Sequence, residues 1–293
     1  MYEKIGEKMI GWIIYNEQDA NENKSYIEWF ILEAKKQGID LQLKLRHELV
    51  IGIENGKQTI LYQNIKITKP HFVVIRTIEP FLQLYFEQLA IPVFNNYETA
   101  KICNDKATTY MEMNALQIPV VPSYFMHKAA LPESIPFPFP FILKQTNGRG
   151  GKEVFFIHNE IDWEKAIEQC ANHALVLQSA NVVLGRDVRV FIIGKEIIAA
   201  VLRKNDADFR ANFKLGGTAE RFELNKRDQN MIMKIVERFD FGLVGIDFLI
   251  GTNGELFFNE IEDVVGSRIL SETTDINLLQ KYVHFIKKRV EKQ

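Results

Sequence analysis

The sequence predicts a mixed fold, with an α/β lobe over residues 1–98 followed by α+β structure in the rest of the chain. Up to residue 98, short apolar runs alternate with amphipathic segments, which is the pattern of strands and crossover helices in a parallel sheet. Beyond that point the expected strands mostly pair with their neighbours along the chain. With 293 residues the chain is long enough for two or three lobes with separate small cores.

The first lobe is expected to begin with a buried strand over residues 9–15. Apolar residues at helical spacing then predict a helix over 25–37, and Gly38 is typical of a residue that ends a helix. The remaining elements expected in this lobe are strands at 39–45, 72–75 and 91–94 and a helix at 81–89.

The rest of the chain is expected to open with a helix over residues 100–117, which carries Lys106. A stretch rich in proline and phenylalanine at 134–140 leads into a strand at 141–145. Further strands are expected at 153–157, 175–178, 187–193, 196–203, 243–250 and 255–262, and further helices at 161–171, 226–239 and 277–290.

Composition argues against several classes of protein. The formal net charge of −2 gives no bulk attraction to nucleic acid or to an acidic membrane. No apolar run approaches ~18 residues, so no membrane span is expected. The two cysteines, Cys103 and Cys170, are too few for a disulfide framework and lack the spacing of a zinc site. A reducing cytoplasm is therefore the expected location.

The segment 245–262 holds the most informative chemical pattern, because an Asn-Gly pair at 253–254 predicts a tight turn between two antiparallel arms. A two-residue turn places residue 247 opposite 260, and a four-residue loop places it opposite 258. In both registers one face carries Asp247, Phe258, Glu260 and Glu262. Crowded carboxylates need a compensating cation, and hard oxygen ligands suit magnesium held together with phosphates. A solvated acidic face is the alternative, although the flanking residues are apolar.

A glycine-rich loop follows the strand that carries Lys144, and its glycines are Gly148, Gly150 and Gly151. A strand follows this loop where a Walker-type phosphate loop requires a helix, which excludes that motif. A glycine hairpin can still offer backbone N–H groups to a triphosphate, and Lys144 can reach a phosphate as a point charge. A plain hairpin is an equally good interpretation of this loop taken by itself.

Basic residues gather between the glycine loop and the carboxylate hairpin. Asp187 and Arg189 are expected on one side of a strand, because side chains two residues apart point the same way. Arg203, Arg210 and Lys214 follow. Cations beside an acidic metal site are what phosphoryl transfer needs. For any one of these residues a surface salt bridge is the simpler explanation, so the inference rests on the set.

Taken in order, these segments resemble the ATP-grasp superfamily, and most closely its RimK-type branch of ribosomal-protein glutamate ligases. The resemblance covers residues ~9 to 290 and implies an ATP-grasp fold: a pre-ATP-grasp α/β lobe at 1–98, a central lobe at 99–179 and a C-terminal lobe at 180–293, with ATP clamped between the last two. The matching stretches are 104–110, 141–145 with its glycine loop, 176–179, 185–189, 208–212 with 216–217, and the hairpin from Asp247 to Glu260.

The resemblance also implies roles for individual residues. ATP would be bound by Lys106 and Lys144 at the phosphates under the glycine loop, by Gln178 and Ser179 at the adenine hinge, by Asp187 at the ribose, and by Arg210 and Asn212 beside the triphosphate. Asp247 and Glu260 would bind the metal ions. Arg189 and Arg203 would act as the catalytic pair that orients the acyl substrate and stabilises an acyl-phosphate step.

One departure from the family pattern concerns the second metal ligand. Relatives carry Glu-x-Asn where this chain has Glu260 and Glu262, so the site gains a negative charge. Asn259 is not expected to replace the missing amide, because on a regular strand it faces away from Glu260. We hypothesise that Glu262 binds the second magnesium ion and that Arg268 offsets the added charge or contacts the substrate.

The resemblance implies a carboxylate–amine ligase that uses ATP and two magnesium (or manganese) ions, forms an acyl phosphate, and releases ADP and phosphate. The implied substrates are amino acids or peptides, selected by the first lobe and by the loops around Arg76, Lys214 and Arg268. Relatives often form dimers or tetramers, so a homo-oligomer is expected. Two alternatives stay open: an ATP-grasp kinase, and a nucleotide-binding regulatory protein without turnover.

Overall fold

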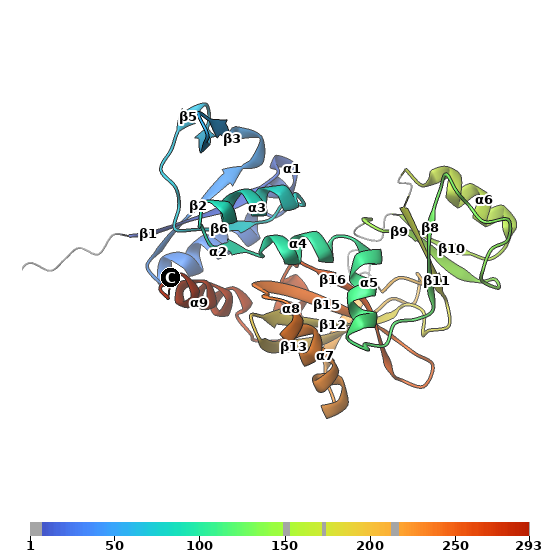
Figure 1. The fold of residues 1–293 in the computed structure, drawn as a ribbon. Helices are drawn as coiled ribbons and strands as arrows, with labels where there is room; N and C mark the ends of the chain where they lie inside the picture. The colour runs from blue at the N-terminus through green and yellow to red at the C-terminus, as the bar shows by residue number, and fades with distance from the viewer. Residues whose placement is uncertain (1–7, 149–152, 172–173, 212–216, 293) are drawn as a thin grey trace, which may run out of the picture.

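The computed structural model describes residues 8–148, 153–171, 174–211 and 217–292. Three groups of elements are visible in Figure 1: a first lobe, a central lobe at the right and a C-terminal lobe below them. No helix in the described part of the chain has both the length and the apolar character needed to cross a membrane.

The first lobe is built on a four-stranded parallel sheet, as the alternating sequence pattern predicts. Its strands lie in the order β2-β1-β6-β7, and the chain therefore leaves the central strand β1 first to one side and then to the other. Their bounds are β1 (Met9–Tyr15), β2 (Ile39–Leu45), β6 (Phe72–Ile75) and β7 (Val93–Phe94), and the helices are α1 (Glu17–Glu22), α2 (Lys24–Lys36) and α3 (Pro80–Gln88).

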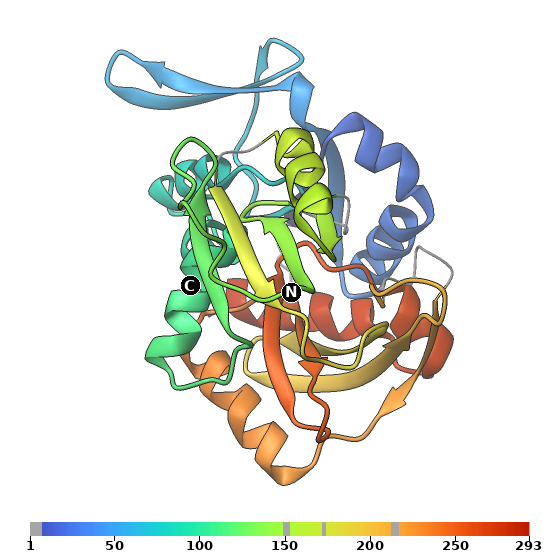
Figure 2. The ribbon, with the colours of Figure 1, turned by 90° about the vertical axis from the view of Figure 1, so that its right-hand side faces the viewer.

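The chain segment between β2 and β6 forms a small antiparallel sheet that was not predicted from the sequence. It follows the short helix η1 (Arg46–Glu48) and consists of β3 (Leu49–Glu54), β4 (Lys57–Tyr62) and β5 (Ile65–Lys66). Figure 2 shows this sheet projecting as an arm beyond the rest of the chain. Its base is anchored to α3, because the hydroxyl of Tyr85 donates to the carbonyl oxygen of Thr59 at 2.6 Å.

The central lobe holds a four-stranded antiparallel sheet in the order β10-β9-β11-β8. The single helix expected over 100–117 is two helices, because Asp105 caps a new helix by accepting from the N–H of Thr108 at 2.7 Å. The elements are α4 (Tyr97–Cys103), α5 (Lys106–Ala115), β8 (Ser123–His127), β9 (Phe141–Gln145), β10 (Val154–Ile157), α6 (Glu160–Gln169) and β11 (Ala174–Ser179).

The C-terminal lobe holds a five-stranded antiparallel sheet in the order β14-β13-β12-β15-β16. One face packs against α7, and the other packs against α8, α9 and the first lobe. The elements are β12 (Arg186–Ile193), β13 (Glu196–Lys204), β14 (Thr218–Phe222), α7 (Lys226–Arg238), β15 (Leu243–Ile250), β16 (Leu256–Glu262), α8 (Arg268–Thr273) and α9 (Leu278–Val290).

The strand β12 shows how this sheet positions a polar site beside an apolar core. Phe191 and Ile193 share one face and are buried in the core that joins the first and C-terminal lobes. Asp187 and Arg189 continue the same face toward the other end of the strand, since alternate residues point the same way. Both line a cleft, so the face changes from core to polar site within a few residues.

Candidate active site

The cleft lies between the sheet of the central lobe and the sheet of the C-terminal lobe. Charged side chains line one part of it, and apolar side chains line another. Six cationic and four anionic side chains line it, which gives an excess of positive charge suited to an anionic ligand. The charged residues are Lys106, Lys144, Arg186, Arg189, Arg203, Arg210, Asp187, Asp247, Glu260 and Glu262. The apolar part is formed by Ile142, Val154, Val182, Val183, Leu184, Phe209, Ala211 and Leu249.

The carboxylate hairpin pairs Asp247 with Glu260, as the two-residue-turn register predicts. The turn itself is longer, because the N–H of Gly251 donates to the carbonyl oxygen of Glu255 and leaves three residues in the loop. Gly254 sits in that loop at φ +84°, a conformation that favours glycine. The register shifts by one residue between Asp247 and Phe248, which marks a β-bulge in the opposite strand.

This bulge corrects two of the sequence predictions. Phe248 pairs with Phe258, so Phe258 turns into the core and does not share the carboxylate face. Asn259 was expected to face away from Glu260, and this is also wrong. It lines the same cleft, and its Oδ1 accepts from Lys144 Nζ at 3.1 Å. The extra residue in β16 re-aims both side chains, an arrangement that a regular strand would not allow.

Asp247 lies at the centre of a buried network of ion pairs. Its two carboxylate oxygens accept from Nε and Nη2 of Arg189, each at 2.7 Å, and Oδ2 also accepts from Nη2 of Arg203 at 2.8 Å. Burial would raise the pKa of Asp247, but the two guanidinium groups outweigh it and lower the pKa to about 2. Asp247 is therefore ionised and held by three N–H donors from two arginines.

The network extends to one further carboxylate on each side. Arg203 Nη2 lies 2.6 Å from Asp187 Oδ2, and Arg189 Nη1 lies 2.6 Å from Glu262 Oε2. Burial, together with the nearby charge of Asp247, raises the pKa of Asp187, although Arg203 opposes this. The two arginines thus bridge three acidic residues of β12, β15 and β16, and Asp187 has little free capacity for the ribose that was expected there.

The compensating cation that the hairpin needs is therefore supplied by arginine in this structure. Within the described residues, no three acidic, histidine or cysteine side chains lie close enough to form a metal site. The guanidinium of Arg189 lies between Asp247 and Glu262. Arg268 was proposed to offset Glu262, but Arg268 is exposed on α8 and Arg189 has that position instead.

Two features of the donor set still fit magnesium. Glu260 is partly exposed to the cleft, and the buried Oε2 of Glu262 has no well-aligned hydrogen bond despite its ion pair with Arg189. Carboxylate oxygens of this kind are the ligands that magnesium prefers. Asp247 could join them only if it released one of its guanidinium partners.

Lys144 forms a second cationic cluster on the opposite wall of the cleft. Its ammonium group is held by three neutral oxygens: the Tyr110 hydroxyl at 2.9 Å, Gln178 Oε1 at 3.0 Å and Asn259 Oδ1 at 3.1 Å. Burial lowers the pKa of Lys144 to about 8. No carboxylate of the described chain forms an ion pair with it, so its charge is available to an anion that enters the cleft.

Lys106 lies beside this cluster, at the first residue of α5. Its Nζ donates to the carbonyl oxygen of Gly148 at 2.5 Å and lies 3.5 Å from Glu260 Oε2. Lys106 therefore connects the start of the glycine loop to the carboxylate hairpin. Gly148 lines the cleft, whereas Gly150 and Gly151, also named from the sequence, lie outside the described residues.

Three further predicted residues, Gln178, Ser179 and Arg210, also line the cleft. Gln178 directs its amide at Lys144 and donates from Nε2 to the Tyr110 hydroxyl, so its side chain is not free to contact a base. Ser179 also lines the cleft, and its Oγ accepts from the N–H of Asn181. Arg210 lines it too, in a two-point ion pair with Asp208. Asn212 and Lys214 lie outside the described residues.

Tyr110 is a site residue that the sequence analysis missed. It contacts both Lys144 and Gln178. The signal for it was present, because Tyr110 follows Lys106 by four residues on one helix, and residues at that spacing share a face.

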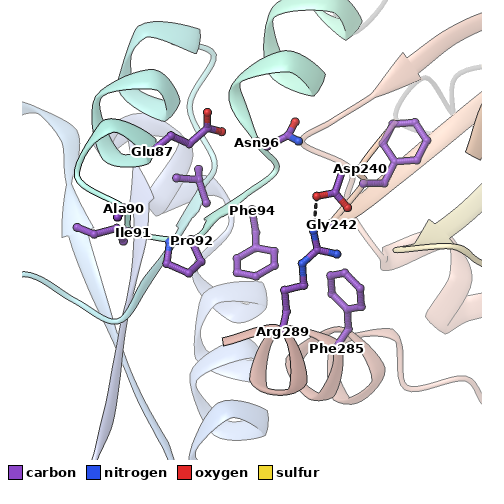
Figure 3. Close-up of a pocket in the computed structure, with 12 residues that line it drawn as sticks. Glu87, Ala90, Ile91, Pro92, Phe94, Asn96, Asp240, Gly242, Phe285 and Arg289 are labelled. Carbon is purple, nitrogen blue, oxygen red and sulfur yellow. Dashed lines mark hydrogen bonds and ion pairs between the residues drawn. The ribbon is translucent and has the colours of Figure 1, made fainter. Parts of the chain in front are cut away.

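A second pocket of about 490 Å³ lies where β7 and α3 meet the start of β15 and the helix α9 (Figure 3). It shares no lining residue with the cleft. Its exposed ion pair joins Arg289 to Asp240, and these two charges neutralise each other. Its charged lining residues Glu87, Asp240 and Arg289 are partly or fully exposed, whereas the cleft holds buried charged residues, Asp247 among them.

Comparison with known proteins agrees with this geometry. A model of the RimK-like ATP-grasp domain matches residues 103–286. Glutamate–LysW ligase ArgX of Sulfurisphaera tokodaii is 28% identical over 262 residues, 85% of this chain and 92% of that protein. Beta-citrylglutamate synthase B of Homo sapiens is 25% identical over 271 residues, 85% of this chain and 70% of that protein. A solved RimK domain ATP-grasp protein of Sphaerobacter thermophilus has a TM-score of 0.72 at 15% identity and covers 94% of this chain and 98% of its own. The ATP-grasp fold predicted from the sequence is confirmed.

Proposed function

The chain belongs to the RimK-like ATP-grasp family, and it is an ATP-dependent ligase that forms carbon–nitrogen bonds between carboxylates and amines; we propose that its amine substrate is glutamate or a close analogue. The names of two relatives support this substrate, since one is a glutamate–LysW ligase and the other a beta-citrylglutamate synthase. The excess of cationic side chains in the cleft supports it as well, because a dicarboxylic amino acid and ATP are both anionic.

We place ATP across the cleft according to the chemistry of its walls. The apolar part around Val182, Leu184 and Phe209 suits the base, and Lys106 and Lys144 suit the phosphates. Magnesium would neutralise charge on the phosphates, and Glu260 and Glu262 are the residues proposed to hold it. A second ion, magnesium or manganese, is proposed only with Asp247 as a further ligand.

The reaction proposed for this cleft has two steps. An oxygen of the substrate carboxylate attacks the γ-phosphorus of ATP, and ADP leaves. The amine of the second substrate then attacks the acyl carbon. Phosphate leaves with the carboxylate oxygen that attacked the phosphorus in the first step, and the amine loses a proton. Arg189 and Arg203 are proposed to orient the acyl group and to balance the charge that develops in both steps. They stand at the cleft beside Asp247.

The observation that carries the proposal is the contrast between Lys144, held by neutral oxygens, and the arginine–carboxylate network that faces it. A lysine in that state can bind phosphate without first losing an ionic partner. The cytoplasm, which supplies ATP and keeps thiols reduced, is the proposed location, and a dimer or tetramer is the proposed assembly.

A product screen tests this function. The protein is incubated with ATP, magnesium, isotope-labelled glutamate and a mixture of metabolite carboxylates and peptides, and the products are analysed by mass spectrometry. We expect a labelled amide, with ADP and phosphate released in equal amounts. A phosphorylated small molecule without amide would indicate a kinase, and the absence of both products would indicate a regulatory protein. The Lys144→Met variant, which is expected to use ATP poorly, serves as the low-activity control.

A further inference from the structure

The strand order of the first-lobe sheet reverses at β1. The chain adds β2 on one side of β1 and then returns to add β6 on the other side. In open α/β sheets, ligands bind at the carboxyl ends of the strands at such a point. Tyr15 is the last residue of β1, and Arg76 directly follows β6. The sheet therefore brings an arginine and a tyrosine to the place where this kind of fold binds ligands.

Arg76 is a buried cation without an anion. Its side chain is 8% exposed, its Nε donates to the Tyr15 hydroxyl at 3.1 Å, and its Nη2 donates to the carbonyl oxygen of Val265 at 3.0 Å. No carboxylate in the ranges that the structure describes pairs with it. A guanidinium group has five N–H donors and these bonds use two of them. A buried charge without a partner is unfavourable, and proteins normally pair such a group.

The surroundings of Arg76 are aromatic and contain a hydroxyl without a hydrogen-bond partner. Its guanidinium carbon lies 5.8 Å from the centre of the Tyr15 ring and 5.2 Å from that of Tyr26. The Tyr26 hydroxyl is buried without a hydrogen-bond partner. Burial raises the pKa of Tyr26 to about 12, so this hydroxyl stays protonated and can donate. Ring contacts stabilise the cation, but they leave these donors unsatisfied.

The other buried arginines of the chain show what Arg76 lacks. Arg189 and Arg203 each bind carboxylate oxygens through two or more N–H groups. Arg76 has the same burial and only a hydroxyl and a carbonyl as acceptors. A carboxylate brought by a ligand would complete its environment.

Arg76 is connected to the proposed reaction centre through two residues, Val265 and Gly245. Val265, whose carbonyl oxygen it binds, packs against Gly245: a Cβ at Gly245 would lie 2.8 Å from Val265 Cγ2 and 3.3 Å from Arg189 Cδ. Arg189 in turn contacts Asp247 and Glu262. A group bound at Arg76 would thus lie next to the end of the cleft where the acyl group is proposed to react.

We propose that Arg76, with the Tyr26 hydroxyl, binds a carboxylate of the amine substrate and thereby selects amino acids over simple amines. This rests on the proposed function, since it assigns one end of the proposed substrate to the first lobe. The carboxylate would accept from the unused guanidinium N–H groups and from the tyrosine hydroxyl. The amino group would then point past Val265 toward the activated acyl carbon.

Binding measurements on the full chain test this assignment. Calorimetric titrations use L-glutamate and its two monoamides, glutamine and isoglutamine, with a nonhydrolysable ATP analogue and magnesium present. The wild-type protein is expected to bind glutamate at least ~10-fold more tightly than one of the monoamides. Arg76→Gln is expected to abolish that preference by weakening glutamate binding ~10-fold or more, while the affinity for the ATP analogue stays unchanged.

Two further variants separate binding from folding. Tyr26→Phe removes an unpartnered hydroxyl and keeps the ring, so the protein should fold normally and bind glutamate ~3-fold or more weakly. Arg46→Gln, which alters an arginine of the same lobe already paired with Glu79, is the matched control and should bind as the wild type does.

The outcomes distinguish the assignment from the proposed function. Equal preference for glutamate in the wild type, Arg76→Gln and Tyr26→Phe overturns the assignment, whatever the change in stability. Failure of the wild type to prefer the acid over either monoamide overturns it too. The product screen judges the proposed function separately, because amide formation there does not depend on how the amine substrate is selected.

Discussion

The two walls of the cleft hold cations in opposite ways. Lys144 is held by three neutral oxygens, whereas Arg189 and Arg203 are held by carboxylates. The lysine keeps its positive charge available and loses some basicity through burial. The arginines have their charge balanced within the protein. One wall is therefore ready for an anion, and the other must exchange partners before a metal or substrate binds.

The difference predicts that the arginine wall contributes more to folding and the lysine wall more to nucleotide binding. Buried ion pairs are costly to break from one side, because the remaining charge has no partner. A buried lysine among neutral groups can be replaced by an apolar side chain without leaving an uncompensated charge. Substitutions on the two walls should therefore separate stability from affinity.

The largest effect is expected for Asp247→Ala. It leaves Arg189 and Arg203 without their shared carboxylate, and the free energy of unfolding should fall by about 3–5 kcal/mol with loss of ligase activity. Denaturant titration measures the change. Glu220→Ala, which breaks an exposed pair with Lys204, is the control and should shift stability by less than about 0.5 kcal/mol. A similarly small shift for Asp247→Ala would contradict the contrast between the walls.

Lys144→Met should show the reverse behaviour. The free energy of unfolding is expected to stay within about 1 kcal/mol of the wild type, because Tyr110 and Gln178 remain bonded to each other. Loss of a charge-assisted contact to phosphate should lower kcat/KM for ATP by about 100-fold. Lys128→Met, in the same lobe outside the cleft, should leave kinetics unchanged. Unaltered ATP kinetics in Lys144→Met would show that the lysine does not contact phosphate.

The pH dependence of ATP binding should follow Lys144. Its pKa is lowered to about 8, so the lysine is charged below that pH and neutral above it. ATP binds the charged form, and the dissociation constant should therefore rise as pH increases from about 7.5 to 9, by up to about 10-fold per pH unit. Fluorescence titration with a labelled ATP analogue measures this. The dependence should disappear in Lys144→Met, and its persistence there would assign it to another group.

Glu262→Gln tests whether the arginine wall also binds magnesium. The substitution removes one charge from the oxygens proposed as ligands and one ionic partner from Arg189. The magnesium concentration for half-maximal activity should rise about 10-fold, in line with the effect of altering a metal site. Magnesium titrations of activity at saturating ATP give this value. An unchanged magnesium concentration for half-maximal activity would show that Glu262 does not bind the metal.

The smallest effect is expected for Asn259→Ala. Lys144 loses one of three neutral acceptors but keeps the other two. A single hydrogen bond of about 1 kcal/mol corresponds to about a 5-fold increase in the KM for ATP. Steady-state kinetics would detect it. An effect as large as that of Lys144→Met would mean that Asn259 contacts the nucleotide itself.

The alternation of strands and helices predicted the parallel sheet of the first lobe, because that pattern is local. The arm β3–β5 was missed although its signal is also local. Asn55 and Gly56 both have positive φ, at 51° and 75°, which is the turn that an Asn-Gly pair forms between two strands. The helix break at Asp105 was missed for a similar reason, since a capping aspartate was present in the sequence.

The sequence predicted most of the residues that line the site, but not which of them contact one another. Two pairings of Asp247 were open from the sequence, with residue 260 or with residue 258. Asp247 faces Glu260 because a three-residue loop is combined with the bulge at Asn259, and this bulge depends on tertiary contacts. The N–H of Phe258 donates to the carbonyl oxygen of Pro119 and its ring packs on Tyr110, both outside the hairpin. The pairing of Arg189 with Asp247 likewise depends on the position of β12 beside β15. No local pattern encodes that strand order.

The most direct test of the ligase mechanism follows the oxygen that leaves with phosphate. Carboxylate substrates labelled with the heavy oxygen isotope are incubated with the protein, ATP, magnesium and glutamate, and the released phosphate is analysed by mass spectrometry. Attack of the carboxylate on the γ-phosphorus predicts one labelled oxygen in each phosphate released together with an amide. Unlabelled phosphate released together with an amide would contradict activation of the carboxylate in this cleft.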